Sequence, residues 1–156
     1  MAHPIVGHIH LTVADLERSL AFYRDLLGFE VSARYGTSAV FLSAGGYHHH
    51  IGLNTWNGEG AKPAPKGHTG MYHVAFLYPD RKSLANTLKR IADAGYPLEG
   101  AADHGVSEAI YLRDPDDNGV EIYADRPRET WKVSNDGMVE MVSKPLDLDK
   151  LLAQAD

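Results

Sequence analysis

An internal duplication constrains the fold of this chain more than any other feature of its sequence. In both halves a predicted strand is followed by a helix and by further short strands, and superposing the halves places His8 opposite His73. Seven positions after each histidine stands an aspartate, Asp15 or Asp80, near the start of a predicted helix. Repetition of one supersecondary unit predicts that two copies of a small module build the fold.

The two predicted modules cover about residues 5–56 and 70–126, and together they form a single domain over residues 1–127. Between them, residues 57–69 are rich in Gly and Pro and have no hydrophobic period, which is typical of a connecting loop. Residues 128–156 match neither module, so we expect a C-terminal extension that packs outside the modules or at a subunit interface. The duplicated plan with this extension suggests a homodimer.

Signals in the sequence mark the ends of the predicted helices in the two modules. In the first half Asp15 can cap the helix and Gly28 can end it, and in the second half the helix over residues 83–95 ends at Gly95. The apolar residues at helical spacing are Leu16, Leu20, Tyr23 and Leu27, then Leu84, Leu88 and Ile91, and finally Leu148, Leu151 and Leu152 in a short C-terminal helix. Strands are predicted over residues 5–13, 29–35, 38–44, 48–56, 71–78, 109–115 and 119–125.

Composition narrows the possible partners. The net charge of -6 and the pI near 5.8 argue against nucleic acid or an anionic membrane as the main partner, because both require a basic surface. The chain has no cysteine, so any metal must be bound by nitrogen and oxygen ligands. No stretch has the form of a secretory leader or approaches the roughly 20 apolar residues of a membrane span. We therefore expect a cytoplasmic protein that acts on a small molecule.

Two histidines and one carboxylate are the candidates for a metal centre. His8 and His73 lie in the first predicted strand of each half, and Glu121 lies in the last strand of the second half. Strands of a curved sheet can bring such side chains together as a facial triad with open coordination positions, which suits Fe(II), Mn(II) or Zn(II). The alternative is that all three are ordinary core or surface residues. The equivalent positions of the two histidines in a duplicated module favour the metal site.

Three stretches of the sequence, "GHIHLTVADLERSLAFYRDLLGFEV", "GMYHVAF" and "IYLRDPDDNGVEIY", resemble the vicinal oxygen chelate superfamily. This superfamily includes glyoxalases, antibiotic-resistance proteins and extradiol ring-cleaving dioxygenases, and the resemblance extends from about Val6 to Pro127. It implies an α+β fold in which two βαβββ modules form a curved mixed β-sheet cleft around one divalent metal. The implied ligands are His8, His73 and Glu121, with His10 as the rival of His8.

A further resemblance to the extradiol dioxygenases concerns residues around the metal. In those enzymes a histidine before the linker, a histidine in an "HG" turn and a tyrosine ten positions before the glutamate ligand complete the site. The matching residues here are His49, His104 and Tyr111, the last two in "DHGVSEAIY". The segment between His104 and Tyr111 is shorter than in the better-known two-domain enzymes, which makes His104 the less secure match.

The run "HHH" at residues 48–50 poses a question of orientation. In an extended strand His48 and His50 would point to one side and His49 to the other. The spacing found in the family favours His49 as the acid–base group, with its two neighbours structural, solvent-facing or in support of the site residues. An error of one residue in register would exchange these roles.

The resemblance therefore implies an extradiol dioxygenase that uses Fe(II), or else Mn(II) or another divalent metal, to cleave a catechol-like aromatic diol with O2. His49, His104 and Tyr111 would be its catalytic residues. One alternative is a metal-dependent isomerase, lyase or epimerase, in which Glu121 or a metal-bound water moves a proton next to a carbonyl. Another alternative is a protein of the same fold that binds a ligand without chemistry.

Overall fold

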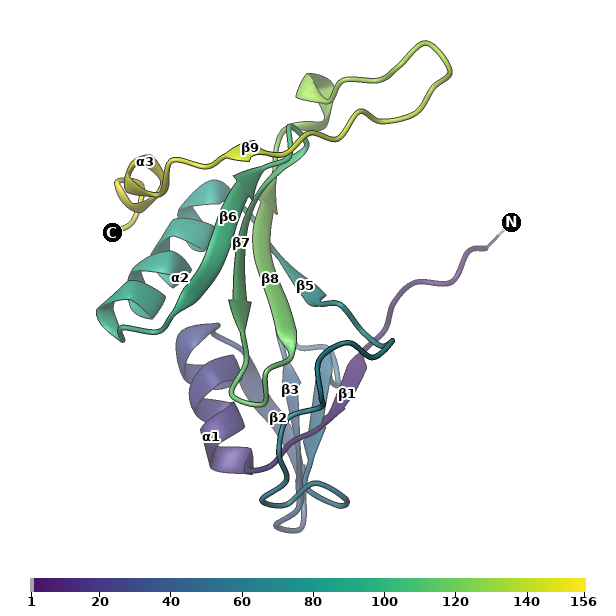
Figure 1. Ribbon diagram of the computed structural model, residues 1–156, viewed down its shortest axis with the longest axis vertical. Helices are drawn as coiled ribbons and strands as arrows, with labels where there is room; N and C mark the ends of the chain where they lie inside the picture. The colour runs from purple at the N-terminus through teal and green to yellow at the C-terminus, as the bar shows by residue number, and fades with distance from the viewer. Residues whose placement is uncertain (1) are drawn as a thin grey trace. The chain divides into compact units, whose positions relative to one another are not determined.

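A computed structural model describes residues 2–156 as two compact units, each with its own sheet and helix (Figure 1). The first unit comprises the chain up to Lys66 together with Pro115–Asp117, and the second comprises Gly67–Asp114 and Asn118–Asp156. Both units are mixed α+β structures, which confirms the predicted fold class. The prediction of a single domain over residues 1–127 stays a prediction.

The two units repeat one order of elements, strand, helix and three strands, and so confirm the duplicated βαβββ plan. The first unit contains β1 (Ile9–Thr12), α1 (Leu16–Leu20), the π-helical segment η1 (Ala21–Leu26), β2 (Glu30–Tyr35), β3 (Ala39–Ser43) and β4 (Ile51–Asn54). The second contains β5 (Val74–Tyr78), α2 (Arg81–Asp93), β6 (Leu98–Asp103), β7 (Ser107–Arg113) and β8 (Gly119–Asp125). The strand orders are β1-β4-β3-β2 and β5-β8-β7-β6-β9, where β9 (Lys144–Pro145) comes from the C-terminal extension, and only the first pair of each sheet is parallel.

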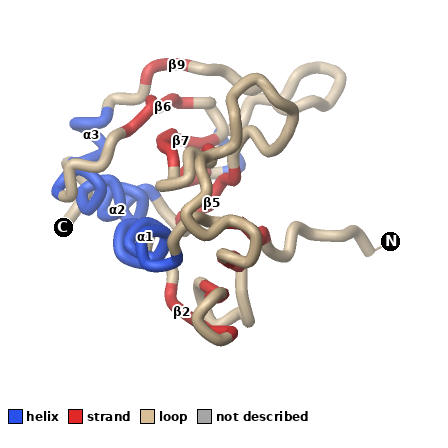
Figure 2. The backbone as a smooth tube through the Cα atoms, turned by 60° about the horizontal axis from the view of Figure 1, so that its bottom comes forward, coloured by secondary structure: helices blue, strands red, loops and turns tan. Residues whose placement is uncertain are grey.

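The C-terminal extension belongs to the second unit. It contains the 3-10 turn η2 (Arg128–Thr130), the short strand β9 (Lys144–Pro145) and α3 (Leu148–Leu152). Figure 2 shows β9 beside β6 and α3 beside α2. Leu151 of α3 is fully buried, and the Asp156 carboxylate is bonded to the Lys82 ammonium of α2. The predicted C-terminal helix is therefore confirmed and anchors the end of the chain.

The helix signals act as the sequence predicts. Asp15 accepts a hydrogen bond from the Arg18 amide at 2.8 Å, and Asp80 accepts one from the Ser83 amide at 2.7 Å, so each caps an N-terminus. After the helices, Gly28 and Gly95 adopt φ values of 91° and 63°. Most of the predicted apolar positions form the cores, with Leu20 and Tyr23 fully buried in the first unit and Leu84 and Ile91 in the second. The exceptions, which are partly exposed, are Leu16, Leu148 and Leu152.

The outer strands of the two sheets differ. All residues of β2 are exposed, and a bulge interrupts its pairing with β3 between Val31 and Ala33. The matching strand β6 is covered over Ala102 and Asp103 by β9. No helix within residues 2–156 is long and apolar enough to span a membrane.

Three predicted strands begin later than expected, at Ile9, Ile51 and Val74. The histidines at 8, 48–50 and 73 therefore precede their strands, and the prediction of an extended "HHH" strand is wrong. The cause is local bonding, because the Ala44 amide donates to the His50 ring at 3.2 Å and the His50 amide donates to the Leu42 carbonyl at 2.8 Å. Strand β6 was not predicted, because its residues "LEGAAD" lack β-branched and aromatic side chains.

Candidate active site

His73 and Glu121 form a close pair in the second unit. The parallel ladder of β5 and β8 aligns Val74 with Val120 and Ala75 with Glu121, and this register brings the residue before β5 next to β8. Nε2 of His73 lies 3.0 Å from Oε2 of Glu121, and both side chains are only partly exposed. A Cβ at Gly119 would collide with the main chain of Tyr72, so a glycine is required where the two strands converge.

Tyr111 lies beside this pair on the neighbouring strand. The antiparallel ladder places Tyr111 of β7 directly opposite Glu121, and the rings of Tyr111 and His73 are 6.0 Å apart between centroids. Burial raises the pKa of Tyr111 above its ordinary value, and the charge of Glu121 adds to this effect. The phenol is therefore protonated at neutral pH and can donate a hydrogen bond.

His104 completes the group from the turn between β6 and β7. Its Nε2 lies 2.5 Å from the hydroxyl of Tyr111, and its Nδ1 lies 2.8 Å from the carbonyl oxygen of Val142 in the C-terminal extension. The second unit thus brings together four predicted site residues, His73, His104, Tyr111 and Glu121, as two bonded pairs. A cavity of about 230 Å³ is lined by His73 and Tyr111, together with Tyr72, Leu112 and Arg113.

In the first unit His49 lies against His8. Their ring centroids are 4.4 Å apart, and the ring of His49 also contacts Phe41 at 5.1 Å. Burial lowers the pKa of His49 below its ordinary value, and the neighbouring His8 and His48 lower it further. This keeps the imidazole of His49 neutral near pH 7, with a nitrogen that can accept a proton.

Of the other two histidines of the run, only His48 departs from the predicted alternation. His50 accepts a hydrogen bond from the Ala44 amide and contacts the ring of Tyr47, away from His8. His48 contacts Tyr47 as well, but its Nδ1 is also 2.7 Å from Nδ1 of His49. His48 is therefore a direct neighbour of the candidate acid–base residue rather than a residue of the opposite face.

Only the second unit has a carboxylate at the position of Glu121. The ladders align Ile9 with Ile51 in one unit and Val74 with Val120 in the other, so that Gly52 corresponds to Glu121. In the first unit His10 lies over this glycine, where an added Cβ would come within 2.8 Å of the imidazole ring. His10 is thus packed on the sheet against Phe41 and Trp56, whereas His8 faces His49.

A divalent metal fits the chemistry of these donors. An imidazole nitrogen and a carboxylate oxygen that face each other at 3.0 Å are ligands that iron and manganese accept. Within residues 2–156, neither unit by itself brings together three His, Asp or Glu side chains that could hold a metal ion. His73 and Glu121 therefore form the pair that the structure supports, and His8 as the third ligand stays a prediction.

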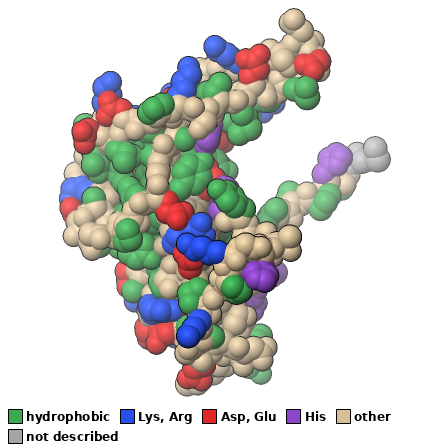
Figure 3. Space-filling view, viewed as in Figure 1, with side chains coloured by type: hydrophobic (Ala, Val, Ile, Leu, Met, Phe, Trp, Pro, Cys, Tyr) green, Lys and Arg blue, Asp and Glu red, His purple; other side chains and the backbone are tan. Residues whose placement is uncertain are grey.

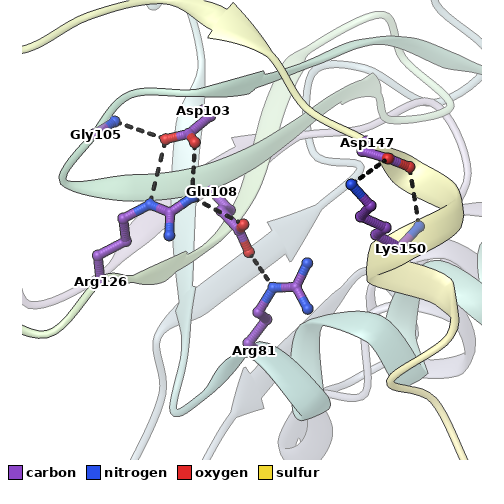
Figure 4. A network of polar contacts seen from close by, with 7 residues as sticks. All are labelled: Arg81, Asp103, Gly105, Glu108, Arg126, Asp147 and Lys150. Atoms are coloured by element: carbon purple, nitrogen blue, oxygen red, sulfur yellow. Dashed lines mark hydrogen bonds and ion pairs between the residues drawn. The ribbon is translucent and has the colours of Figure 1, made fainter.

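A network of charged side chains surrounds the turn that carries His104, and sequence reasoning missed it (Figure 4). Asp103 accepts hydrogen bonds from Arg126 at 2.7 Å and from the Gly105 amide at 2.8 Å. The buried Glu108 is bonded to Arg126 at 3.0 Å and to Arg81 at 2.6 Å. The one signal in the sequence is a charged residue next to the apolar run "AIYL" of a predicted strand.

The larger cavity of the first unit contains none of the predicted site residues. It has a volume of about 840 Å³ and lies at the start of α1, where Asp15, Arg34 and Glu59 contribute to its lining. Two contacts join residues of its lining: Asp15 accepts a hydrogen bond from the Arg18 amide, and Arg34 lies 3.8 Å from Glu17. The histidine clusters therefore stay the candidate site.

The chain matches known proteins over most of its length. The family model described as "Glyoxalase/Bleomycin resistance protein/Dioxygenase superfamily" matches residues 5–122. A catechol-2,3-dioxygenase of Bacillus subtilis (strain 168) is 41% identical over 96% of this chain and 52% of its own length. A manganese-dependent 2,3-dihydroxybiphenyl 1,2-dioxygenase of Geobacillus genomosp. 3 is 31% identical over 76% of this chain and 36% of its own length.

Among solved structures, a glyoxalase/dioxygenase from Nostoc punctiforme has a TM-score of 0.67 and 22% identity over 79% of this chain and 92% of its own. This likeness concerns the fold. The chain spans about half the length of the Bacillus relative and about a third of the length of the Geobacillus relative.

Proposed function

The chain belongs to the glyoxalase/bleomycin resistance protein/dioxygenase superfamily, and from this premise we propose that it is a metal-dependent extradiol dioxygenase that cleaves a catechol-like ring with O2. The observation that carries the proposal is the hydrogen-bonded pair of His104 and Tyr111 in the unit that holds His73 and Glu121. Ring cleavage needs groups that take a proton from the diol and return one, and an imidazole–phenol pair can do both.

The names of the relatives support the substrate class and the kind of metal. The Bacillus relative is named for catechol, and the Geobacillus relative is named for a dihydroxybiphenyl and for manganese. An aromatic diol fits both names, and Mn(II) fits the second; Fe(II) as the preferred ion rests on the resemblance to the extradiol dioxygenases. Because this chain spans only part of each relative, the activity of the chain by itself is part of the proposal.

His8, His73 and Glu121 are the residues that would hold the metal. When bound, the ion supplies a Lewis acid that orients the two oxygens of a diol and favours their ionisation. His49 accepts a proton from a diol hydroxyl, since its lowered pKa leaves the ring neutral near pH 7. Tyr111 lines the cavity and shares one hydrogen with Nε2 of His104 at 2.5 Å, so this pair can take up and return a proton at the edge of the cavity.

Oxygen uptake tests the reaction. Protein loaded anaerobically with Fe(II) is mixed with a panel of catechols in air-saturated buffer, and an oxygen electrode and the absorbance of the ring-opened product are followed together. We expect one O2 to be consumed for each ring opened. No uptake with any catechol refutes the dioxygenase, and the isomerase, lyase or epimerase chemistry, with Glu121 as base, then takes its place. A protein that binds no metal at all supports the alternative of a non-catalytic binding protein.

Variants separate the metal ligands from the acid–base residues. His8→Ala, His73→Ala and Glu121→Ala should each lower the metal content, while the control His68→Ala, in the linker, should not. Full metal occupancy in all three ligand variants rejects this ligand set.

The acid–base variants should keep the metal and lose ring cleavage. For His49→Ala, His104→Gln and Tyr111→Phe we expect losses on the order of 10²- to 10⁴-fold. The matched control is Tyr96→Phe, because it also removes a hydroxyl that donates a hydrogen bond, here to the carbonyl of Arg113 at 2.8 Å. Equal losses in Tyr111→Phe and Tyr96→Phe count against a catalytic role of the Tyr111 hydroxyl.

We also propose a cytoplasmic homodimer. The C-terminal extension supports association because it exposes large apolar side chains, and Figure 3 shows hydrophobic atoms on its surface. The most exposed of them are Val133, Met138 and Met141. A strictly monomeric species in light scattering at micromolar concentration contradicts the dimer, and recovery in the membrane or secreted fraction contradicts the location.

A further inference from the structure

Both ring nitrogens of His104 are engaged, and one of their partners comes from outside the duplicated modules. Nε2 lies 2.5 Å from the hydroxyl of Tyr111, and Nδ1 lies 2.8 Å from the main-chain oxygen of Val142. Val142 is part of the C-terminal extension, 38 positions along the chain from His104. The extension therefore reaches a residue of the candidate active site through its main chain.

The two partners differ in what they can do in a hydrogen bond. A carbonyl oxygen can only accept, so the bond to Val142 forms only if Nδ1 carries the hydrogen. A neutral imidazole has one N–H group, which leaves Nε2 as an acceptor, and the phenol of Tyr111 can donate to it. Which nitrogen of a histidine is protonated is set by the bond that the other nitrogen makes.

Val142 is held in this position by its own amide and by the chain that follows it. Its own amide donates to the carbonyl of His104 at 3.1 Å, so the two residues are joined twice. Two residues further on, Lys144 of β9 pairs with Asp103 of β6, and beyond β9 the buried Leu151 anchors α3. The carbonyl that faces His104 is thus placed by the fold of the extension and not by a freely moving tail.

We propose that the C-terminal extension selects the tautomer of His104, with Val142 as a positioning residue whose carbonyl keeps the hydrogen on Nδ1 and leaves Nε2 as the proton acceptor toward Tyr111. The proposal deepens the function proposed above and rests on it for the role of His104 in catalysis. It gives the extension, which matches neither module, a defined part in the acid–base chemistry.

The tautomer can be read directly by ¹⁵N NMR of the imidazole. The full-length protein is labelled at its histidines and studied without paramagnetic metal, at a pH where His104 is neutral, and its signals are assigned by their loss in His104→Gln. We expect Nδ1 in the range of a protonated ring nitrogen and Nε2 in the range of an unprotonated one. The reverse assignment in the wild-type protein overturns the proposal.

Two variants test what sets the tautomer. Val142→Pro removes the amide that ties the segment to His104, so both nitrogen signals should move toward the average of two tautomers. The matched control Met141→Pro alters an exposed neighbour whose amide has no backbone partner in residues 2–156, and it should leave the signals unchanged. The proposal is refuted if Val142→Pro is folded, as judged by circular dichroism, and keeps the ¹⁵N spectrum of the wild type.

Tyr111→Phe keeps the test decisive even where Val142→Pro fails to fold. It removes the competing donor at Nε2 and leaves the contact with Val142 in place. Nδ1 should remain protonated in this variant, and a switch to protonated Nε2 shows that Tyr111, not the extension, sets the tautomer.

Kinetics separate this proposal from the proposed function. In an active enzyme Val142→Pro should lower kcat on the order of 10²-fold, with unchanged KM for catechol and unchanged metal content. A loss of the same size in Met141→Pro, or a rise in KM alone, contradicts a positioning role. A wild-type protein that shows the expected tautomer but consumes no oxygen with catechols refutes the dioxygenase and leaves the tautomer assignment standing.

Discussion

Replacing Arg126 by Met should destabilise the second unit far more than a surface ion pair would suggest. Arg126 is bonded to Asp103 at 2.7 Å and to Glu108 at 3.0 Å. The side chain of Glu108 is only 8% exposed, whereas that of Asp103 is 27% exposed. Without the guanidinium, Asp103 can bind water, but Glu108 stays buried with Arg81 as its remaining partner.

The buried carboxylate determines the size of the effect. A hydrogen bond to a charged group contributes about 1.5–3 kcal/mol, and leaving a buried charge short of a partner adds to the cost. We expect Arg126→Met to lower the free energy of unfolding by about 2–4 kcal/mol. The matched control is Arg113→Met, because Arg113 pairs with Glu99 where both side chains are exposed, at 36% and 50%. That pair should contribute about 0–1 kcal/mol.

The free energy of unfolding of both variants is measured by urea denaturation of the full chain, followed by circular dichroism. The slope of this free energy against urea concentration shows whether the variants unfold in the same transition as the wild type. In a Glu108→Leu background the cost of Arg126→Met should fall, since no buried carboxylate then loses a partner. Equal destabilisation by Arg126→Met and Arg113→Met refutes this reasoning. The same holds if Glu108→Leu leaves the cost of Arg126→Met unchanged.

Three further predictions concern stability. The Arg126 guanidinium holds the pKa of the Asp103 carboxyl below its ordinary value, so Asp103 stabilises the fold above its unfolded-state pKa of about 3.9 and loses this contribution as the pH falls through its folded value. Asp103→Asn should therefore cost stability at pH 7 and progressively less below about pH 4 in urea titrations at several pH values. Gly52→Ala would place a Cβ 2.8 Å from the ring of His10, and calorimetry should show a loss of about 1–3 kcal/mol from overpacking. Leu151→Ala should lower stability by about 2–5 kcal/mol in urea unfolding because this side chain is fully buried.

Each of these changes has a control on the same protein. Gly100→Ala adds a Cβ with no atom within 4 Å, so it should cost less than Gly52→Ala. Leu152→Ala removes a partly exposed side chain and should cost less than Leu151→Ala. A difference between the wild type and Asp103→Asn that does not change between pH 7 and pH 3 speaks against the ion pair with Arg126.

The sequence predicted the features of this fold that depend on neighbouring residues. A cap and a stop lie within a few positions of the helix they bound, so Asp15 and Gly28 could be recognised from local patterns and their geometry matches. The duplication predicted the order of elements in both units, because equivalent segments such as those around His8 and His73 share their spacing. The resemblance to the extradiol dioxygenases implied one site for Tyr111 and Glu121, and the β7–β8 ladder places these two residues opposite each other.

What the sequence could not predict depends on contacts between distant residues. The bond between His104 and Val142 joins two segments without a shared pattern, and nothing local marks the carbonyl of Val142 as a partner.

The predicted orientation of the "HHH" run was wrong for a different reason. The rule of alternation applies to an extended chain, but the bonds of Ala44 and Leu42 to His50 turn the chain before β4 begins. Side-chain direction in such a turn follows these local hydrogen bonds rather than the period of the sequence.

The different outer strands of the two sheets have a consequence for aggregation. An unpaired strand edge offers main-chain donors and acceptors to other molecules, and natural sheets blunt such edges with bulges, charges or a covering segment. β2 uses the first two devices, since it has a bulge after Val31 and carries Glu30 and Arg34. β6 has β9 over Ala102 and Asp103 instead. A chain shortened before Lys144 would lose α3 and would also open the edge of β6 to strand addition by a second molecule, so it should lose solubility on storage.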